Sequence, residues 1–165
     1  MIKLNERQTD VLFAVLRAGL WNDTPPEALT LLASSLNDEE WKALFHAVRE
    51  QAVTGIFTDG LKLVTERTSG CEFAYLNGIM LLSKLEKRNL LLVEAVAELK
   101  KKYPGGWIFK GPQLIDYYPY PLHRETGDID VVVPGLKEEI DYSYPFKGRN
   151  ITASNSQPIR LLEPI

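Results

Sequence analysis

Cysteine is nearly absent from this sequence, and an excess of basic charge and long apolar segments are absent as well. The single cysteine, Cys71, excludes an internal disulfide and a cysteine-rich zinc site, and is typical of a reducing compartment. The two histidines, His46 and His123, lie too far apart in the sequence, with too few partners, to suggest a metal site. With 19 basic and 22 acidic residues, the formal charge is −3, which argues against binding nucleic acid mainly through bulk electrostatics.

The sequence also lacks the marks of an exported or membrane-spanning chain. Its first ten residues, MIKLNERQTD, have no apolar stretch after a basic start and do not resemble a signal peptide. The apolar run Leu90–Val93 is far shorter than the ~20 residues of a spanning helix. We therefore expect a soluble, cytoplasmic protein. The 165 residues, 45% hydrophobic and 25% charged, are enough for one domain with a sizeable core.

The first hundred residues have the apolar spacing and the capping residues of helices. Asn5 can cap a first helix that continues through Leu20. Thr24, followed by two prolines, can start a second helix that ends near Asn37. Asn37 or Asp38, with two glutamates behind it, can open a third.

Two more helices are predicted before residue 105. Gly55 and Gly60 bracket a shorter helix around Ile56 to Val64. The stretch from Cys71 to Lys102 contains no proline and one glycine, and its apolar residues keep the period of an amphipathic helix. The residues that keep this period are Leu76, Ile79, Met80, Leu85, Leu92, Val96 and Leu99.

The pattern changes from helical to strand-like after residue 106. Trp107–Phe109 has the composition of a short strand, Gln113–Tyr118 is expected to form one or two helical turns, and Asp128–Val133 is a β-branched run ended by Pro134. These patterns predict an α+β fold. Residues 1–105 would form a helical region and residues 106–165 a partial mixed β-sheet with flanking helices, together one structural unit.

Asp128 and Asp130 are the strongest candidates for a metal site. Residues two apart on a strand point to the same side, so both carboxylates would lie on one face, opposite Ile129 and Val131. A divalent cation would relieve their repulsion, and oxygen ligands suit Mg²⁺ or Mn²⁺. Gly127 lets the backbone approach a ligand closely. Taken alone, however, this common pattern is better explained by solvent-exposed carboxylates at a turn and on an open strand face.

A second candidate element precedes this strand. In Phe109-Lys110-Gly111-Pro112, a strand ends at a glycine and leads into a predicted helical turn. Backbone N–H groups at such a turn can hold phosphates, helped by the lysine charge. A phosphate-binding turn followed by paired carboxylates is typical of metal-assisted phosphoryl or nucleotidyl transfer. Taken singly, Lys110 and Gly111 are also explained as a surface lysine and an ordinary turn glycine.

The order and spacing of these segments resemble the signature of the uncharacterised nucleotidyltransferase family. The resemblance is carried by Phe109-Lys110-Gly111-Pro112-Gln113-Leu114, Tyr118-Pro119-Tyr120-Pro121, Arg124 and Gly127–Val133. It extends to the N-terminal helices and covers most of the chain up to about residue 134. It implies that the partial sheet over residues 106–165 is of the nucleotidyltransferase type.

The resemblance implies a Mg²⁺-dependent transfer of a nucleoside monophosphate from an NTP to an acceptor that the sequence does not identify. Asp128 and Asp130 would be the catalytic residues and would hold the metal, Mg²⁺ or Mn²⁺. Lys110 and Gly111 would lie against the phosphates of the NTP.

Two further residues belong to the implied substrate site. Gly127 directly precedes the acidic pair, and Arg124 is a candidate to contact a phosphate or the acceptor. A structural ion pair of Arg124, with Glu125 as the available partner, is an equal alternative. Pro112 departs from the family pattern, which often has a small residue there, and it removes one N–H that could bind phosphate.

Members of this superfamily take a third carboxylate from a later strand, for which Asp141 and Glu163 are the available candidates. The sequence thus resembles a truncated version of the family, and three functions stay open. One is an active nucleotidyltransferase. The second is a catalytically inactive relative that acts as a nucleotide-binding or protein-interaction module. The third is an independent helical interaction domain over residues 1–105, with the rest of the chain as an appendage. An open edge of the incomplete sheet could support a homodimer.

Overall fold

The computed structural model describes residues 3–109, 111–126, 129–132 and 160–161. Most of this chain is helical. The helices are α1 (Glu6–Trp21), α2 (Glu27–Ser34), α3 (Asp38–Glu50), α4 (Thr54–Thr65) and α5 (Glu72–Lys102). The strands are β1 (Trp107–Phe109), β2 (Asp130–Val132) and β3 (Arg160–Leu161), and two 3₁₀ helices, η1 (Gly111–Tyr117) and η2 (Pro121–His123), lie between β1 and β2.

The fold class predicted from the sequence is wrong. We expected an α+β protein whose residues 106–165 form a partial nucleotidyltransferase-type mixed sheet, whereas the described chain is mainly helical. Its β structure is limited to strands of three, three and two residues, in the order β1-β2-β3. Such short strands bury little surface of their own. It is α5, with 31 residues and a length of about 45 Å, that supplies the surface on which the later segments pack.

Helices α1 and α3 begin where the sequence predicted. The side chains of Asn5 and Asn37 each accept a hydrogen bond from the backbone N–H three residues on. The side chains of Gln8 and Glu40 accept one in return from the backbone N–H of the two asparagines, which completes a capping box at both helices. Arg7 of α1 forms a salt bridge with Glu40, so the starts of the two helices are also joined to each other.

Gly55 and Gly60 both lie inside α4, whereas the sequence analysis described them as bracketing a helix around Ile56 to Val64. Their role is close packing. A Cβ on Gly60 would lie 1.9 Å from the carbonyl oxygen of Val15 in α1, and Gly19 of α1 approaches the backbone of α4 in the same way. The glycines therefore allow α1 and α4 to touch through their backbones, a role that helical periodicity alone does not reveal.

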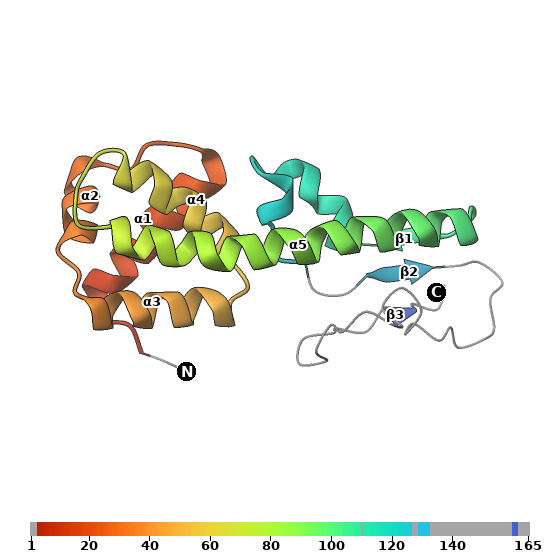
Figure 1. The fold of residues 1–165 in the computed structure, drawn as a ribbon, viewed down its shortest axis with the longest axis horizontal. Helices are drawn as coiled ribbons and strands as arrows, with labels where there is room; N and C mark the ends of the chain where they lie inside the picture. The colour runs from red at the N-terminus through yellow and green to blue at the C-terminus, as the bar shows by residue number, and fades with distance from the viewer. Residues whose placement is uncertain (1–2, 110, 127–128, 133–159, 162–165) are drawn as a thin grey trace.

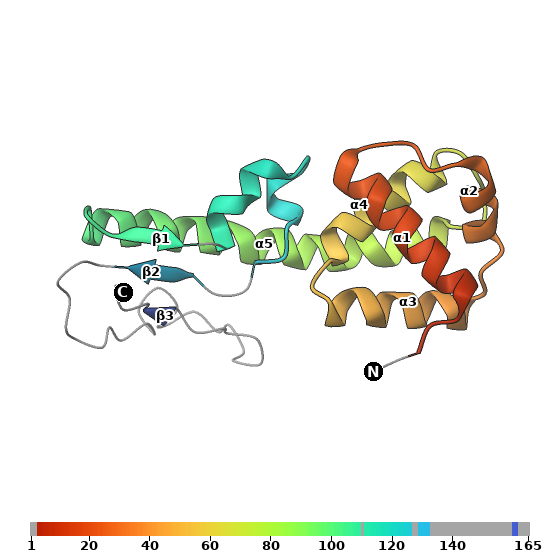
Figure 2. The same cartoon turned by 180° about the vertical axis from the view of Figure 1, so that it is seen from behind.

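Two hydrophobic clusters lie along α5. The first is formed by α1 to α4 with the first part of α5, and Phe57, Leu44 and Leu61 are among its fully buried side chains. The second is smaller and joins the later part of α5 to β1 and to the residue before β2. Its buried members are Ala95, Ile108 and Ile129, with Leu92, Val96 and Leu99 packed against them. Figures 1 and 2 show helices α1 to α4 around one half of α5 and the strands β1 and β2 along the other half.

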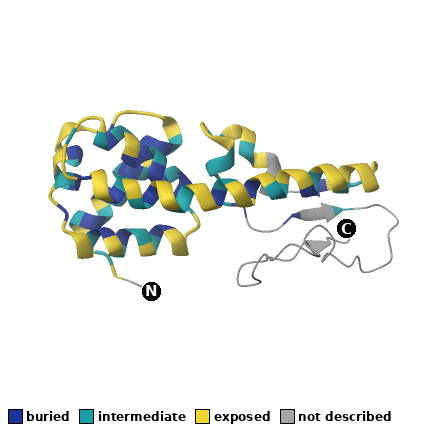
Figure 3. Cartoon of the chain, in the orientation of Figure 1, coloured by how far each residue is buried: buried dark blue, intermediate teal, exposed yellow. Residues whose placement is uncertain are grey.

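The apolar period of α5 marks its buried face only in part. Leu76 and Met80 keep the period but are exposed, as are long stretches of the outer side of this helix in Figure 3. The first half of α5 packs on α4 through the small residues Ala74 and Gly78, which leaves the larger side chains outside. None of the helices in the described part of the chain combines the length and the apolar character needed to cross a membrane.

Candidate functional site

Strands β1 and β2 bring together the two segments that the sequence analysis identified. They run antiparallel, and the register pairs Phe109 with Asp130. The chain therefore leaves β1 and enters β2 at the same edge of the strand pair. In the sequence, Lys110 directly follows Phe109, and Asp128 lies two residues before Asp130.

The structure describes the predicted site residues to different extents. Lys110, Gly127 and Asp128 lie outside the described residues, as do Asp141 and Glu163, the candidates for a third carboxylate. For Gly111 and Asp130 the backbone is described, at the first residue of η1 and of β2 respectively. Among the side chains that are described, no group of three or more His, Cys, Asp or Glu residues could hold a metal ion.

Arg124 is described in full, and two of its contacts are with residues of its own segment of the chain. Its Nη1 donates a hydrogen bond of 2.9 Å to Oγ1 of Thr126, and its guanidinium carbon lies 5.6 Å from the ring centroid of Tyr118. The neighbouring Glu125 accepts a hydrogen bond of 3.1 Å from the backbone N–H of Thr54, the first residue of α4. A carboxylate at a helix N-terminus is electrostatically favourable, and here it comes from a residue far along the chain.

Two side chains of α5 hold the segment that leads to the acidic pair. The amide Nδ2 of Asn89 donates hydrogen bonds of 2.6 Å and 2.8 Å to the carbonyl oxygens of Leu122 and Arg124. One residue earlier, Arg88 donates a hydrogen bond of 2.6 Å to the carbonyl oxygen of Thr126. Asn89 is buried, and its two acceptor residues are half-buried. Residues 122–126 are thereby fixed to α5 directly before residue 127.

His123 lies between two carboxylates from different helices. Its Nδ1 is 2.7 Å and 2.9 Å from the two carboxylate oxygens of Asp59 in α4, and its Nε2 is 3.1 Å from a carboxylate oxygen of Glu86 in α5. The imidazole also stacks on Tyr120, with 5.1 Å between the ring centroids. The side chains of His123 and Asp59 are 14% and 11% exposed, whereas that of Glu86 is 41% exposed.

Burial and charge act in opposite directions on this cluster. Burial lowers the pKa of His123, but the hydrogen bonds and charges of Asp59 and Glu86 outweigh it and hold the pKa above its ordinary value. Burial raises the pKa of Asp59 above its ordinary value, against the lowering effects of the hydrogen bond and charge of His123. The cluster therefore favours a proton on the imidazole.

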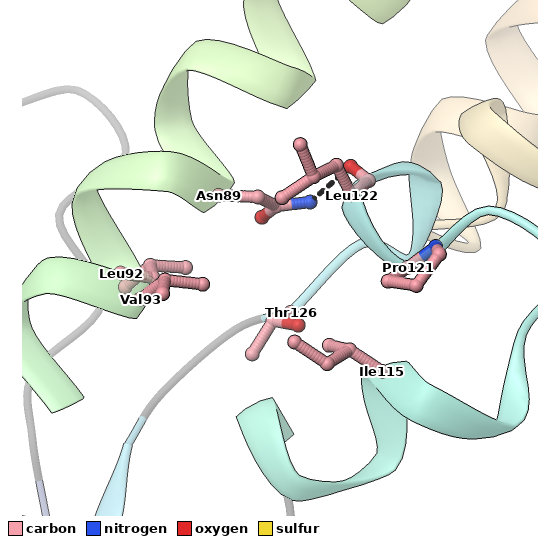
Figure 4. A pocket seen from close by; sticks show the side chains of 7 residues that line it. All are labelled: Asn89, Leu92, Val93, Ile115, Pro121, Leu122 and Thr126. Carbon is pink, nitrogen blue, oxygen red and sulfur yellow. Dashed lines mark hydrogen bonds between the residues drawn. The ribbon is translucent and has the colours of Figure 1, made fainter. Parts of the chain in front are cut away.

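A narrow pocket lies beside the side chain of Asn89 (Figure 4). It is lined by Asn89, Leu92, Val93, Ile115, Pro121, Leu122 and Thr126. The cavity has a volume of about 10 Å³, which is room for one water molecule at most. A nucleotide does not fit there, so the pocket belongs to the packing of this segment on α5.

Sequence reasoning missed Asp59, Glu86 and Asn89. Asn89 could have been found, because it is a polar residue on the same helical stripe as Leu85 and Leu92. A buried polar side chain on such a stripe needs a partner from another segment. Asp59 and Glu86 gave no comparable signal, because only the fold brings their carboxylates close to His123.

The sequence matches no protein-family model, and neither the curated proteins nor the solved structures contain a match. The resemblance to nucleotidyltransferases therefore depends on the sequence features given above, without support from any of these comparisons. The described geometry adds the shared edge of β1 and β2 and the fixed segment 122–126 that precedes the acidic pair.

Proposed function

We propose that this chain is a nucleotidyltransferase-like protein that binds a nucleoside triphosphate with Mg²⁺ and transfers its nucleoside monophosphate to an acceptor. The acidic residues Asp128 and Asp130 would hold the metal, and the turn at Lys110 and Gly111 would contact the phosphates. The observation that carries the proposal is the pairing of Phe109 with Asp130, because it brings one residue of each motif together at one edge of the strand pair.

The residue types at this edge suit a magnesium-bound triphosphate. Carboxylate oxygens are the ligands that Mg²⁺ takes from proteins, and a lysine beside a glycine turn supplies positive charge and N–H donors for phosphate. Bound Mg²⁺ would neutralise charge on the triphosphate during transfer. Transfer forms a bond from an acceptor oxygen to the α-phosphorus and releases pyrophosphate, so the residues at this edge have to hold both groups in line.

The packing of Ile129 supports the proposal. Alternation along the strand predicts that Ile129 faces away from the side of the two aspartates. In the structure Ile129 is fully buried in the smaller hydrophobic cluster, together with Ala95 of α5. With Ile129 facing α5, the opposite side of the strand, on which the two aspartates are expected, would be open to solvent and ligand.

The fixed segment 122–126 is a second point of support. A metal site needs ligands whose positions are set before the metal binds. Asn89 and Arg88 of α5 bind three carbonyl oxygens of this segment, and Glu125 binds the start of α4. The chain is therefore held on two helices immediately before the acidic pair. A contact of Arg124 with phosphate or acceptor is part of the same proposal.

A catalytically inactive relative that binds nucleotides or another protein is the second candidate. The observation that favours it is the set of large apolar side chains exposed on the first half of α5, among them Phe73, Leu76 and Met80. Exposed apolar side chains gathered on one element are typical of interaction surfaces. If this relative binds nucleotides, it differs from the first candidate only in that no pyrophosphate is released. If it binds another protein instead, it needs no nucleotide.

The experiment that tests the proposal is calorimetric titration of the purified chain with ATP, GTP, CTP and UTP, with Mg²⁺ and with EDTA in its place. Saturable binding that requires the metal supports the site. Absence of binding to all four nucleotides by a folded sample overturns it. Pyrophosphate release in the presence of hydroxyl-bearing acceptors then separates transfer from binding alone.

A further inference from the structure

We propose that His123 is a proton-controlled latch that holds residues 120–126 on helices α4 and α5. In the imidazolium form, both ring nitrogens donate hydrogen bonds to carboxylates, one on each helix. Loss of one proton removes one of these donors and loosens the segment. The latch does not depend on nucleotide binding, whereas its consequence for the acidic pair rests on the proposed function.

The first argument is geometric. Nδ1 of His123 lies within hydrogen-bond distance of both oxygens of Asp59, and Nε2 lies within hydrogen-bond distance of Glu86. A neutral imidazole has one N–H, and its other nitrogen carries a lone pair. With neutral His123, one of the two ionised carboxylates would face that lone pair. The imidazolium is the form in which both contacts are hydrogen bonds.

The second argument is the charge balance around the ring. Asp59 comes from α4 and Glu86 from α5, while the segment itself contributes the stacked ring of Tyr120. Lys62 of α4 acts on Asp59 through its charge alone. One imidazolium therefore stands between two carboxylates, and its loss would leave two negative charges from different helices facing the same uncharged ring.

The third argument is the position of His123 at a direct backbone contact between the segment and α4. A Cβ on Gly55 would lie 1.8 Å from the carbonyl oxygen of His123, so the two backbones are in direct contact. One residue before Gly55, the N–H of Thr54 binds Glu125. Because these contacts are made by His123 itself and by a residue two positions on, a change in the two hydrogen bonds of the ring acts on the same part of the segment, five residues before Asp128.

The direction of the pKa shift gives the pH range of the latch. The pKa of His123 in the folded chain is raised above its ordinary value of 6.5, so the folded chain binds this proton more tightly than the unfolded chain does. The latch is therefore fully formed below about pH 6.5 and is lost as the pH rises through the folded-state pKa. The raised pKa of Asp59 also lowers stability as the pH rises, but it does so in the acidic range above 3.8.

The test is amide hydrogen exchange of residues 120–126 in the full chain between pH 5.5 and 9, corrected for the intrinsic exchange rate, with unfolding midpoints in urea at each pH. We expect protection of this segment to fall above pH 6.5 by about tenfold for each unit by which the folded-state pKa of His123 exceeds 6.5. His123→Gln should show low protection at every pH, without this fall. The matched control is His46→Gln, because His46 is an exposed histidine of α3 that lies 3.6 Å from Glu50. It should behave like the parent.

The latch is wrong if His123→Gln keeps the pH profile of the parent. If that variant does not fold, Glu86→Gln replaces it, because Glu86 is partly exposed and its loss should move the fall in protection to lower pH; an unchanged profile overturns the latch. Titration of the four Mg-NTPs at pH 6 and pH 8.5 separates this inference from the proposed function. If the protection of residues 120–126 depends on pH but no nucleotide binds, the latch is supported and the proposed function is wrong. If nucleotides bind but the protection does not depend on pH, the proposed function is supported and the latch is wrong.

Discussion

Gly55 of α4 lies against the backbone of His123, so closely that a Cβ on Gly55 would stand 1.8 Å from the His123 carbonyl oxygen. The same end of α4 offers the N–H of Thr54 to the carboxylate of Glu125. The segment before the acidic pair therefore packs on the first residues of α4. Any residue larger than glycine at position 55 has to displace that segment.

Replacement of Gly55 by alanine should lower the free energy of unfolding by about 1–3 kcal/mol, the usual cost of overpacking a buried contact. Urea denaturation measures the change. Gly105→Ala is the control, because a Cβ on Gly105 would meet no atom within 4 Å. Equal stability of the two variants would show that α4 and the His123 segment are not packed as described.

Replacement of Asn89 by alanine should lower the free energy of unfolding by about 1–3 kcal/mol, because it leaves the half-buried carbonyl oxygens of Leu122 and Arg124 without their donor. Hydrogen exchange should show faster exchange in residues 122–126. Lys87→Ala changes an exposed neighbour on α5 and should have little effect on either measurement. If Asn89→Ala matches this control, the segment is held by other contacts.

Cys71 should react slowly with thiol reagents in the folded protein. Its side chain is fully buried, and burial, with a smaller contribution from the charge of Glu72, raises the pKa of the thiol to about 11. At pH 8 only about 0.1% of such a thiol is thiolate, the reactive form. The reaction of Cys71 with a disulfide reagent, followed by absorbance, should therefore be much faster in urea than in buffer. Equal rates in both solutions would place Cys71 at the surface.

The local part of this fold could be predicted from the sequence, and the part that depends on distant contacts could not. Asn5 and Asn37 cap helices as expected, because a cap involves residues only three positions apart. Gly55 and Gly60 were expected to bracket a helix, since the sequence does not show that another backbone passes close to them. The α+β fold class was wrong for a related reason. The described strands are only three, three and two residues long, and strand composition does not reveal that α5 provides the surface on which β1 packs.

In the candidate site, too, the local features could be predicted from the sequence and the contacts between distant residues could not. The acidic pair and the Lys110-Gly111 turn are contiguous motifs, and the sequence identifies them as candidates without the fold. The partners of His123 lie 64 and 37 residues away from it in the sequence, and only the packing of α4 and α5 brings them to its two ring nitrogens. Asn89 is an intermediate case. The sequence shows that it lies on an apolar stripe of a helix, but it does not show which carbonyl oxygens accept its hydrogen bonds.

The role of the two aspartates as metal ligands is tested by calorimetric titration of Mg-NTP into Asp128→Asn and Asp130→Asn, with Asp10→Asn as the control on the exposed side of α1. We predict that both motif variants lose Mg²⁺-dependent binding, while their free energy of unfolding stays the same or rises slightly because carboxylate repulsion is removed. Asp10→Asn should bind like the parent. If both motif variants bind Mg-NTP as tightly as the parent does, the two aspartates do not hold the metal and the proposed site is wrong.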